Sequence, residues 1–232
     1  MAYILHLETA TKVCSVALAK DGVLVSFMET TIANSHSSLI TSYVDEVIKT
    51  AGISLFELNA VSISMGPGSY TGLRIGVSSA KGFCYALNIP LIAINTLQSM
   101  ANFYATEHSC KLDTDTLLCP MIDARRMEVF TALFDNKVSF IKETSAEIIN
   151  EQSFQKELKL CKIIFFGDGA EKCKQSLSIN HNAIFDENFS VSSKGMISIA
   201  WKKYLDNQFE NVAYFEPYYL KDFIATIPRK MI

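Results

Sequence analysis

One long helix is predicted over residues 71–87, and almost no side of it is suited to water. At about 100° per residue, its larger polar side chains fall within a sector roughly 60° wide. They are Arg74, Ser78, Lys81 and Tyr85. A surface helix normally carries a single apolar stripe, so a nearly all-round apolar helix needs cover on two sides. At least one of these two sides must therefore pack against another part of the chain.

Very small residues form a row along this helix, at Gly72, Gly76 and Ala80, and Gly82 adds a third glycine. A glycine inside a helix costs about 1 kcal/mol relative to alanine. Three of them in one helix indicate that another backbone comes close to it.

The turn Gly66-Pro67-Gly68-Ser69 leads into the helix. Backbone N–H groups at a helix start can bind an anion. However, Pro67 removes one donor, and the spacing matches neither a Walker loop nor a dinucleotide loop, which would have glycine at Thr71. A type II turn centred on Pro67 and Gly68, with Ser69 or Thr71 capping the helix, explains the residues without a ligand and is the favoured interpretation.

Strands and helices alternate through the rest of the first half. Strands are predicted at residues 3–7, 13–19, 23–28, 61–64 and 91–94, and further helices at 37–51 and 96–105. Asp21-Gly22 predicts a tight hairpin, and Gly52 ends the earlier helix. The polar stretch 107–116 has no hydrophobic period, so we place a boundary between lobes of residues 1–106 and 107–232.

The second half repeats the opening at a constant offset of 115 residues. Leu7-Glu8 aligns with Ile122-Asp123, and Ala17-Leu18 aligns with Ala132-Leu133. In both copies a strand ends on a carboxylate, and a second strand, a polar turn and a third strand follow. Such a repeat suggests the duplicated α/β fold of actin, hexokinase and the Hsp70 ATPase (the ASKHA fold). We expect a mixed five-stranded sheet flanked by helices in the first lobe and a smaller, reduced second lobe.

The remainder of the second lobe is predicted as a helix around residues 147–158, a strand at 163–166, a helix through Leu177 and a helix at 192–205. The aromatic tail 214–220 is expected to pack back on the first lobe rather than to lie free.

Net charge, hydrophobic pattern and cysteine content argue against several classes of protein. The formal net charge of −3 argues against a chain that grips nucleic acid unaided. No stretch reaches 18 apolar residues, so no membrane span is expected. Six cysteines without a C-x-x-C pair favour a reduced, cytoplasmic setting.

Two carboxylates at matching strand ends, Glu8 and Asp123, are candidates for holding a magnesium-bound water between the lobes. They can equally accept backbone N–H bonds. The possible anion or nucleotide cleft, a vestige of the ancestral site, comprises Glu8, Thr9, Gly66, Gly68, Ser69 and Asp123. No two histidines are spaced as a helical metal pair, and no serine lies in a nucleophile elbow.

Four segments together resemble one family. They are LHLETATKVCSVAL, SMGPGSYTGLRIGVSSAKGFCYALNIPLIAINTL, IDARRMEVFTALF and PYYLKD. By these the chain is identified as a member of the bacterial TsaB (YeaZ) family. The similarity runs from Ile4 to about Asp222; GPGSYTGLRIG is its most specific part, and the second lobe is looser.

The resemblance implies a non-catalytic subunit of the machinery that makes threonylcarbamoyladenosine in tRNA. Family members pair with a catalytic sibling, TsaD, and with a small ATPase, TsaE. TsaD carries a metal-binding H-x-x-x-H just after a similar run, and the matching positions here are Thr96 and Met100. Neither side chain replaces an imidazole on such a metal. We therefore expect no metal site and no catalytic residue here, with ATP or ADP and a metal held by partner subunits or at the complex interface.

The resemblance also implies docking through the helices at 37–51 and 71–87, onto TsaD or onto a second copy of this chain. Ten residues are expected at this interface: Leu39, Tyr43, Val47, Gly72, Leu73, Arg74, Gly76, Val77, Ala80 and Phe83. Contact with tRNA is expected mainly through the complex. The alternative to docking is that both apolar sides of the helix at 71–87 are buried within this chain, with the second lobe covering the outer side. For function, the alternative is an ATP-using or hydrolytic enzyme with its site between Glu8, Gly68, Asp123 and Asp168, which includes the older glycoprotease interpretation.

Overall fold

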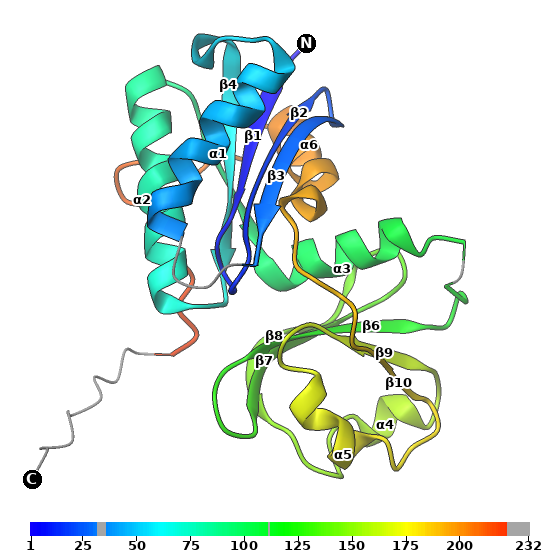
Figure 1. Cartoon of the computed structure of the whole chain (residues 1–232). Helices are drawn as coiled ribbons and strands as arrows, with labels where there is room; N and C mark the ends of the chain where they lie inside the picture. The colour runs from blue at the N-terminus through cyan, green and yellow to red at the C-terminus, as the bar shows by residue number, and fades with distance from the viewer. Residues whose placement is uncertain (32–35, 111, 222–232) are drawn as a thin grey trace, which may run out of the picture.

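Two five-stranded sheets organise the molecule, one in each lobe (Figure 1). The computed structural model describes residues 1–31, 36–110 and 112–221. The first sheet has the order β3-β2-β1-β4-β5. Its strands are β1 (Tyr3–Glu8), β2 (Cys14–Lys20), β3 (Val23–Thr30), β4 (Leu58–Gly66) and β5 (Leu91–Asn95).

The second sheet repeats this topology strand for strand, in the order β8-β7-β6-β9-β10. Its strands are β6 (Leu117–Asp123), β7 (Glu128–Phe134), β8 (Phe140–Ile148), β9 (Ile163–Phe166) and β10 (Ala183–Asp186). In each sheet the first strand runs antiparallel to the second and parallel to the fourth. The predicted duplication is confirmed.

Helices and sheets alternate in layers. Helices α1 (His36–Ala51) and α2 (Tyr70–Leu87) cover one face of the first sheet, and α6 (Ile197–Leu205) covers the other. Helix α3 (Thr96–Glu107) packs on the second sheet. The short α4 (Gln155–Leu158) and α5 (Lys174–Leu177) cover that sheet's far face. Three 3-10 turns, η1 (Leu55–Glu57), η2 (Glu171–Cys173) and η3 (Ser193–Met196), complete the elements.

Several predicted boundaries are confirmed to within a few residues, among them α1, α2 and α3. The Asp21-Gly22 hairpin also forms, with positive φ at both residues. The lobe division between residues 106 and 107 stays a prediction, because α3 ends there and has neighbours in both sheets.

The helix predicted around residues 147–158 is wrong. Its start belongs to β8, where Glu147 pairs with Val129 of the neighbouring strand. Phe154 has φ 59, a left-handed value that breaks any helix passing through it. Only Gln155–Leu158 is helical. Strand β10 was not predicted.

The segment 209–221 lies along the first lobe as a strap. Glu210 donates its N–H to the Leu91 carbonyl at 2.9 Å, and Tyr218 donates to the Met65 carbonyl at 2.8 Å. Lys81 on α2 donates to the carbonyls of Ala213 and Phe215, both at 3.1 Å. Through these contacts the strap lies against β4, β5 and α2 of the first lobe.

Candidate functional site

The small-residue row of α2 faces the interior of its own lobe. Gly72, Gly76 and Ala80 are all buried, and Ala80 has no exposed surface. A Cβ atom built on Gly72 would overlap the carbonyl oxygen of Thr9, and one built on Gly76 would overlap the Thr9 hydroxyl. The close backbone predicted from the glycines is therefore the chain's own turn between β1 and β2.

This packing corrects the predicted interface. Six of its ten residues are buried within the chain and cannot contact a partner: Val47, Gly72, Leu73, Gly76, Val77 and Ala80. The other four keep exposed surface: Leu39, Tyr43, Arg74 and Phe83. The sequence pattern was misread in one respect. A row of small residues indicates that another backbone packs closely against the helix, but it does not indicate whether that backbone belongs to the same chain or to a partner.

The outer side of α2 carries a different set of residues. Ser78, Gly82 and Tyr85 are exposed, and the Tyr85 side chain is 86% exposed. A Cβ atom on Gly82 would meet nothing within 4 Å. Together with the exposed parts of Leu39, Tyr43, Arg74 and Phe83, these residues form what we call the outer face of α1 and α2.

The turn before α2 is held from two sides. The Gly66 N–H donates to Thr96 Oγ1 at 3.1 Å, and the Ser69 N–H donates to the Ala10 carbonyl at 2.6 Å. Ser69 caps α2, as predicted, since its Oγ accepts the Gly72 N–H. These N–H groups are used inside the chain, which leaves fewer donors for an anion.

The predicted type II turn is wrong. Positive φ is found at Gly66 (117°), not at Gly68, and the bond between Gly66 and Pro67 is cis. A Cβ atom on Gly66 would lie 2.6 Å from the carbonyl oxygen of Tyr218 in the strap. The strap therefore lies against Gly66, whereas Ser69 and Thr71 at the start of α2 stay exposed.

Glu8 is fully buried and does not line an open cleft. Its Oε1 accepts the Ala10 N–H at 2.7 Å, while its Oε2 has no hydrogen-bond partner among the described residues. Burial raises the pKa of Glu8 to about 7, although hydrogen bonds from Ala10, Ser64 and Thr9 oppose the rise. This carboxyl group fixes the β1–β2 turn and is shielded from any ligand between the lobes.

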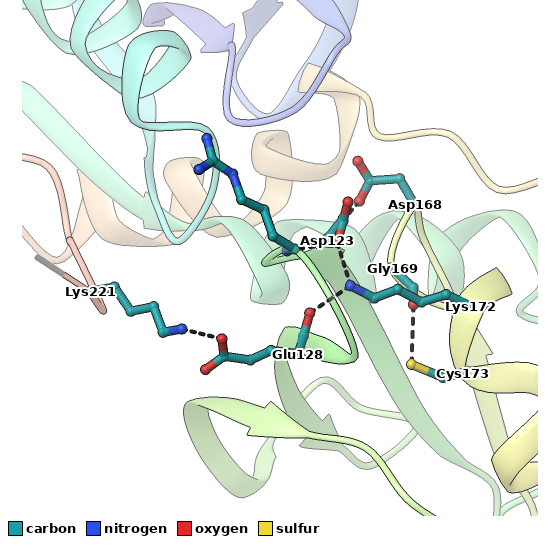
Figure 2. A network of polar contacts seen from close by, with 8 residues as sticks. Asp123, Glu128, Asp168, Gly169, Lys172, Cys173 and Lys221 are labelled. Atoms are coloured by element: carbon teal, nitrogen blue, oxygen red, sulfur yellow. Dashed lines mark hydrogen bonds and ion pairs between the residues drawn. The ribbon is translucent and has the colours of Figure 1, made fainter. Parts of the chain in front are cut away.

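Asp123 belongs to a polar network at the end of β6 (Figure 2). Lys172 donates to Asp123 Oδ1 and, at 2.7 Å, to the Glu128 carbonyl. The Asp123 N–H donates to Asp168 Oδ1 at 3.1 Å. At the other side, Lys221 from the strap pairs with the Glu128 carboxylate. These contacts tie the strap to the β6–β7 hairpin.

The two neighbouring aspartates respond to this network in opposite directions. Burial alone would raise the pKa of Asp123, but the Lys172 hydrogen bond and the Arg125 N–H lower it below its ordinary value. Burial raises the pKa of Asp168. No hydrogen bond or ion pair of the described residues joins Glu8 to Asp123 or Asp168.

The hairpin between β6 and β7 was missed as a candidate site. Arg125 and Arg126 both have positive φ, 71° and 51°, and both are exposed. The signal in the sequence was the dipeptide itself, because a tight turn between strands normally uses Gly, Asn or Asp. Lys172 and Lys221 gave no such signal, since their partners lie 49 and 93 residues away.

Thr96 and Met100 occupy interior positions at the start of α3. Thr96 has no exposed surface, and its Oγ1 lies 2.7 Å from Ser64 Oγ. Met100 is 1% exposed and packs in the core above the second sheet. Across residues 1–31, 36–110 and 112–221 no group of three or more His, Cys, Asp and Glu side chains is arranged to hold a metal ion.

None of the described helices combines the length and the apolar character that a membrane crossing requires.

Comparison with known proteins gives consistent relationships. The family model described as TsaD, tRNA N6-adenosine threonylcarbamoyltransferase, matches residues 27–229. The tRNA threonylcarbamoyladenosine biosynthesis protein TsaB of Escherichia coli is 30% identical over 230 residues, 96% of each chain. The protein of the same name from Bacillus subtilis is 29% identical over 140 residues, 60% of this chain and 58% of the relative.

A solved structure shares the fold. YeaZ from Pseudomonas aeruginosa superposes with a TM-score of 0.79 at 21% identity, and the match covers 95% of this chain and all of the other. Together with the repeated sheets, this likeness gives the two-lobed ASKHA-type fold predicted from the sequence.

Proposed function

Because this chain belongs to the TsaB (YeaZ) family, whose curated members are named as tRNA threonylcarbamoyladenosine biosynthesis proteins, we propose that it serves in that tRNA modification. Its role is that of a non-catalytic subunit, which binds a TsaD-like transferase and activates it. We place this activity in the cytoplasm, with tRNA reached mainly through the assembled complex.

The interior of α3 is the observation that carries the non-catalytic role. The positions that match the metal-binding histidines of TsaD are Thr96 and Met100, and both side chains are used inside the chain. Thr96 holds the turn before α2 through the Gly66 N–H. A thioether and a hydroxyl in a packed core supply no pair of imidazoles for a metal. In this proposal ATP or ADP and the metal are held by TsaD, by the TsaE ATPase or at the complex interface.

The outer face of α1 and α2 is the proposed docking surface. This face replaces the buried row of Gly72, Gly76 and Ala80 as the proposed interface, because only exposed residues can contact a partner. Gly82 leaves room for a partner helix to approach, and Tyr85 offers a large ring that the chain itself leaves 86% exposed. Rings of this kind are enriched where interfaces are well packed. A second copy of this chain occupies the same face when TsaD is absent.

Reconstitution tests the function directly. The cognate threonylcarbamoylation components are assembled with and without this chain, and the modified nucleoside in the tRNA is measured. The proposal expects modification to depend on the chain. Equal yields without it would overturn the proposed function.

One pair of variants tests the docking surface. Gly82→Arg places a long cation on the open side of α2, whereas Gln175→Arg does so at an exposed position on α5, in the other lobe. On a sizing column, Gly82→Arg is expected to elute separately from TsaD and Gln175→Arg to co-elute with it. Both should keep a native circular dichroism spectrum. Normal assembly of Gly82→Arg would remove this face from the proposal.

A further inference from the structure

The tip of the β6–β7 hairpin holds two arginines in an unfavourable backbone conformation. Arg125 and Arg126 follow one another in the left-handed region, which costs an ordinary L-residue roughly 1–2 kcal/mol at each position. Asp123 Oδ1 accepts the Arg125 N–H at 2.9 Å, and the Glu128 N–H donates to the Arg125 carbonyl at 3.2 Å. Asparagine and glycine would adopt this turn more cheaply, so the turn itself gives no reason for the two guanidinium groups.

Both arginine side chains are exposed and form no hydrogen bond or ion pair with any described residue. Two of the nearby carboxylates pair with lysines, and a third, Asp168, accepts the Asp123 N–H. Lys172 pairs with Asp123 and Lys221 pairs with Glu128, and Lys12 also lies close enough to lower the pKa of Asp123.

These pairings leave the two guanidinium groups uncompensated in a chain whose formal net charge is −3. A local positive charge on an acidic protein marks a surface for an anionic partner.

The network behind the hairpin holds this tip in place (Figure 2). Lys172 reaches across from η2 to both sides of the hairpin base, at Asp123 and at the Glu128 carbonyl. The strap fixes the Glu128 side chain through Lys221. A ligand-binding group supported on a fixed base loses less conformational entropy when it binds.

The strap also carries an aromatic ring close in sequence to Lys221. Two residues before Lys221, the Tyr219 ring lies 4.9 Å from the Tyr70 ring, centroid to centroid. Cations interleaved with aromatic rings suit a nucleic acid, because phosphates meet the cations and bases stack on rings and guanidinium planes. An acidic protein partner would use the charges alone.

We propose that the Arg125–Arg126 tip binds the phosphate backbone of RNA, and within the proposed function, on which this inference rests, that RNA is the tRNA substrate. The tip supplies positional contacts without reading the sequence, since phosphate contacts fix orientation. Most of the affinity is left to the other subunits, in keeping with the overall acidic charge.

The test uses the full chain, alone and with its TsaD partner, and a fluorescently labelled unmodified tRNA. Arg125→Asn combined with Arg126→Gly removes both cations and gives the turn residues that it prefers. The matched control is Lys156→Asn combined with Lys159→Asn, at exposed positions beside α4 with the same loss of charge. Affinity is measured by anisotropy over a series of salt concentrations.

The hairpin variant should bind tRNA about tenfold more weakly than the wild type. For this variant, the slope of the logarithm of the association constant against the logarithm of salt concentration should decrease in magnitude by about 0.7–0.9 for each lost phosphate contact. The control variant should match the wild type, and the hairpin variant should melt at the same temperature or higher, which excludes misfolding as the cause.

Three results would overturn the inference: equal losses in the two variants, no loss in the hairpin variant, or no tRNA binding by the wild type in either setting. If the hairpin variant instead stops co-eluting with TsaD and keeps its tRNA affinity, the tip is a protein contact and the inference is wrong. The reconstitution assay separates this inference from the proposed function, because dependence of modification on the chain can hold whether or not the tip binds RNA.

Discussion

The carbonyl oxygen of Thr9 lies against Gly72 so closely that a side chain on Gly72 would overlap it. The Thr9 hydroxyl then donates to the Gly72 carbonyl at 2.8 Å. The turn between β1 and β2 is thereby pressed onto the first turns of α2. The glycines of α2 are explained by this contact inside the lobe, and the helix is left with an open side at Gly82.

Gly72 and Gly82 should therefore respond in opposite directions to alanine. Gly72→Ala forces backbone apart and is expected to lower the free energy of unfolding by about 2–3 kcal/mol. Gly82→Ala meets nothing within 4 Å, so it should raise the free energy of unfolding by up to about 1 kcal/mol through helix propensity. Urea denaturation followed by circular dichroism measures both. A stable Gly72→Ala variant would contradict the packing described for Thr9.

The repeated architecture could be predicted from the sequence because both copies keep the same alternation of apolar strands and polar turns. The offset that joins Glu8 to Asp123 reflects two sheets of identical strand order. The roles of the two carboxylates could not be predicted in this way. Glu8 is buried under its own turn, whereas Asp123 is partly exposed and pairs with Lys172. Their difference arises from neighbours distant in sequence.

Local pattern also failed where a strand lies at the edge of a sheet. Among the described residues, 140–148 pair with β7 alone, along one side, and their side chains are exposed or half-buried. Edge strands often carry charged residues, so the polar stretch around Glu147 predicts the start of a helix although it belongs to β8. The strap contacts were likewise hidden, because Lys81 binds carbonyl groups more than 130 residues away.

Glu8 should make stability depend on pH. Its pKa is about 7 in the folded chain against an ordinary value of 4.5, so between these values the folded state holds more protons than the unfolded state. Stability contributed by this group is therefore lost as pH rises from 4.5 through 7. The shift corresponds to roughly 3 kcal/mol. The loss should be absent in Glu8→Gln, whose amide oxygen can still accept the Ala10 N–H.

The measurement is the difference in unfolding free energy between Glu8→Gln and the wild type at pH values from 4.5 to 8. The buried His6, whose pKa is lowered to about 3 by burial, affects both proteins equally and cancels in the difference. Glu151→Gln, at an exposed position, serves as the control. A difference that stays constant over this range would show that Glu8 ionises as an ordinary glutamate.

Replacing the strained arginines should stabilise the hairpin. Arg125→Asn with Arg126→Gly relieves two left-handed residues, although glycine gives back part of the gain through greater freedom in the unfolded chain. A net gain of about 1 kcal/mol is expected, which for a chain of this size is roughly 2–4 °C in melting temperature. Calorimetry provides the measurement. A lower melting temperature would mean that the arginine side chains stabilise the fold, against the absence of described partners for them.

Lys81 should control how firmly the strap is held. Its ammonium group donates to the carbonyls of Ala213 and Phe215, and Lys81→Met keeps the length of the side chain while removing both hydrogen bonds. Amide hydrogens of the strap should then exchange about tenfold faster, as expected from a loss of about 1.4 kcal/mol in local opening, within the range for hydrogen bonds to charged groups. Lys49→Met, at an exposed position on α1, changes the same charge without touching the strap. Faster exchange in both variants would assign the effect to charge, whereas unchanged exchange in Lys81→Met would show that the pairing of Tyr218 with Met65 and of Lys221 with Glu128 holds the strap by itself.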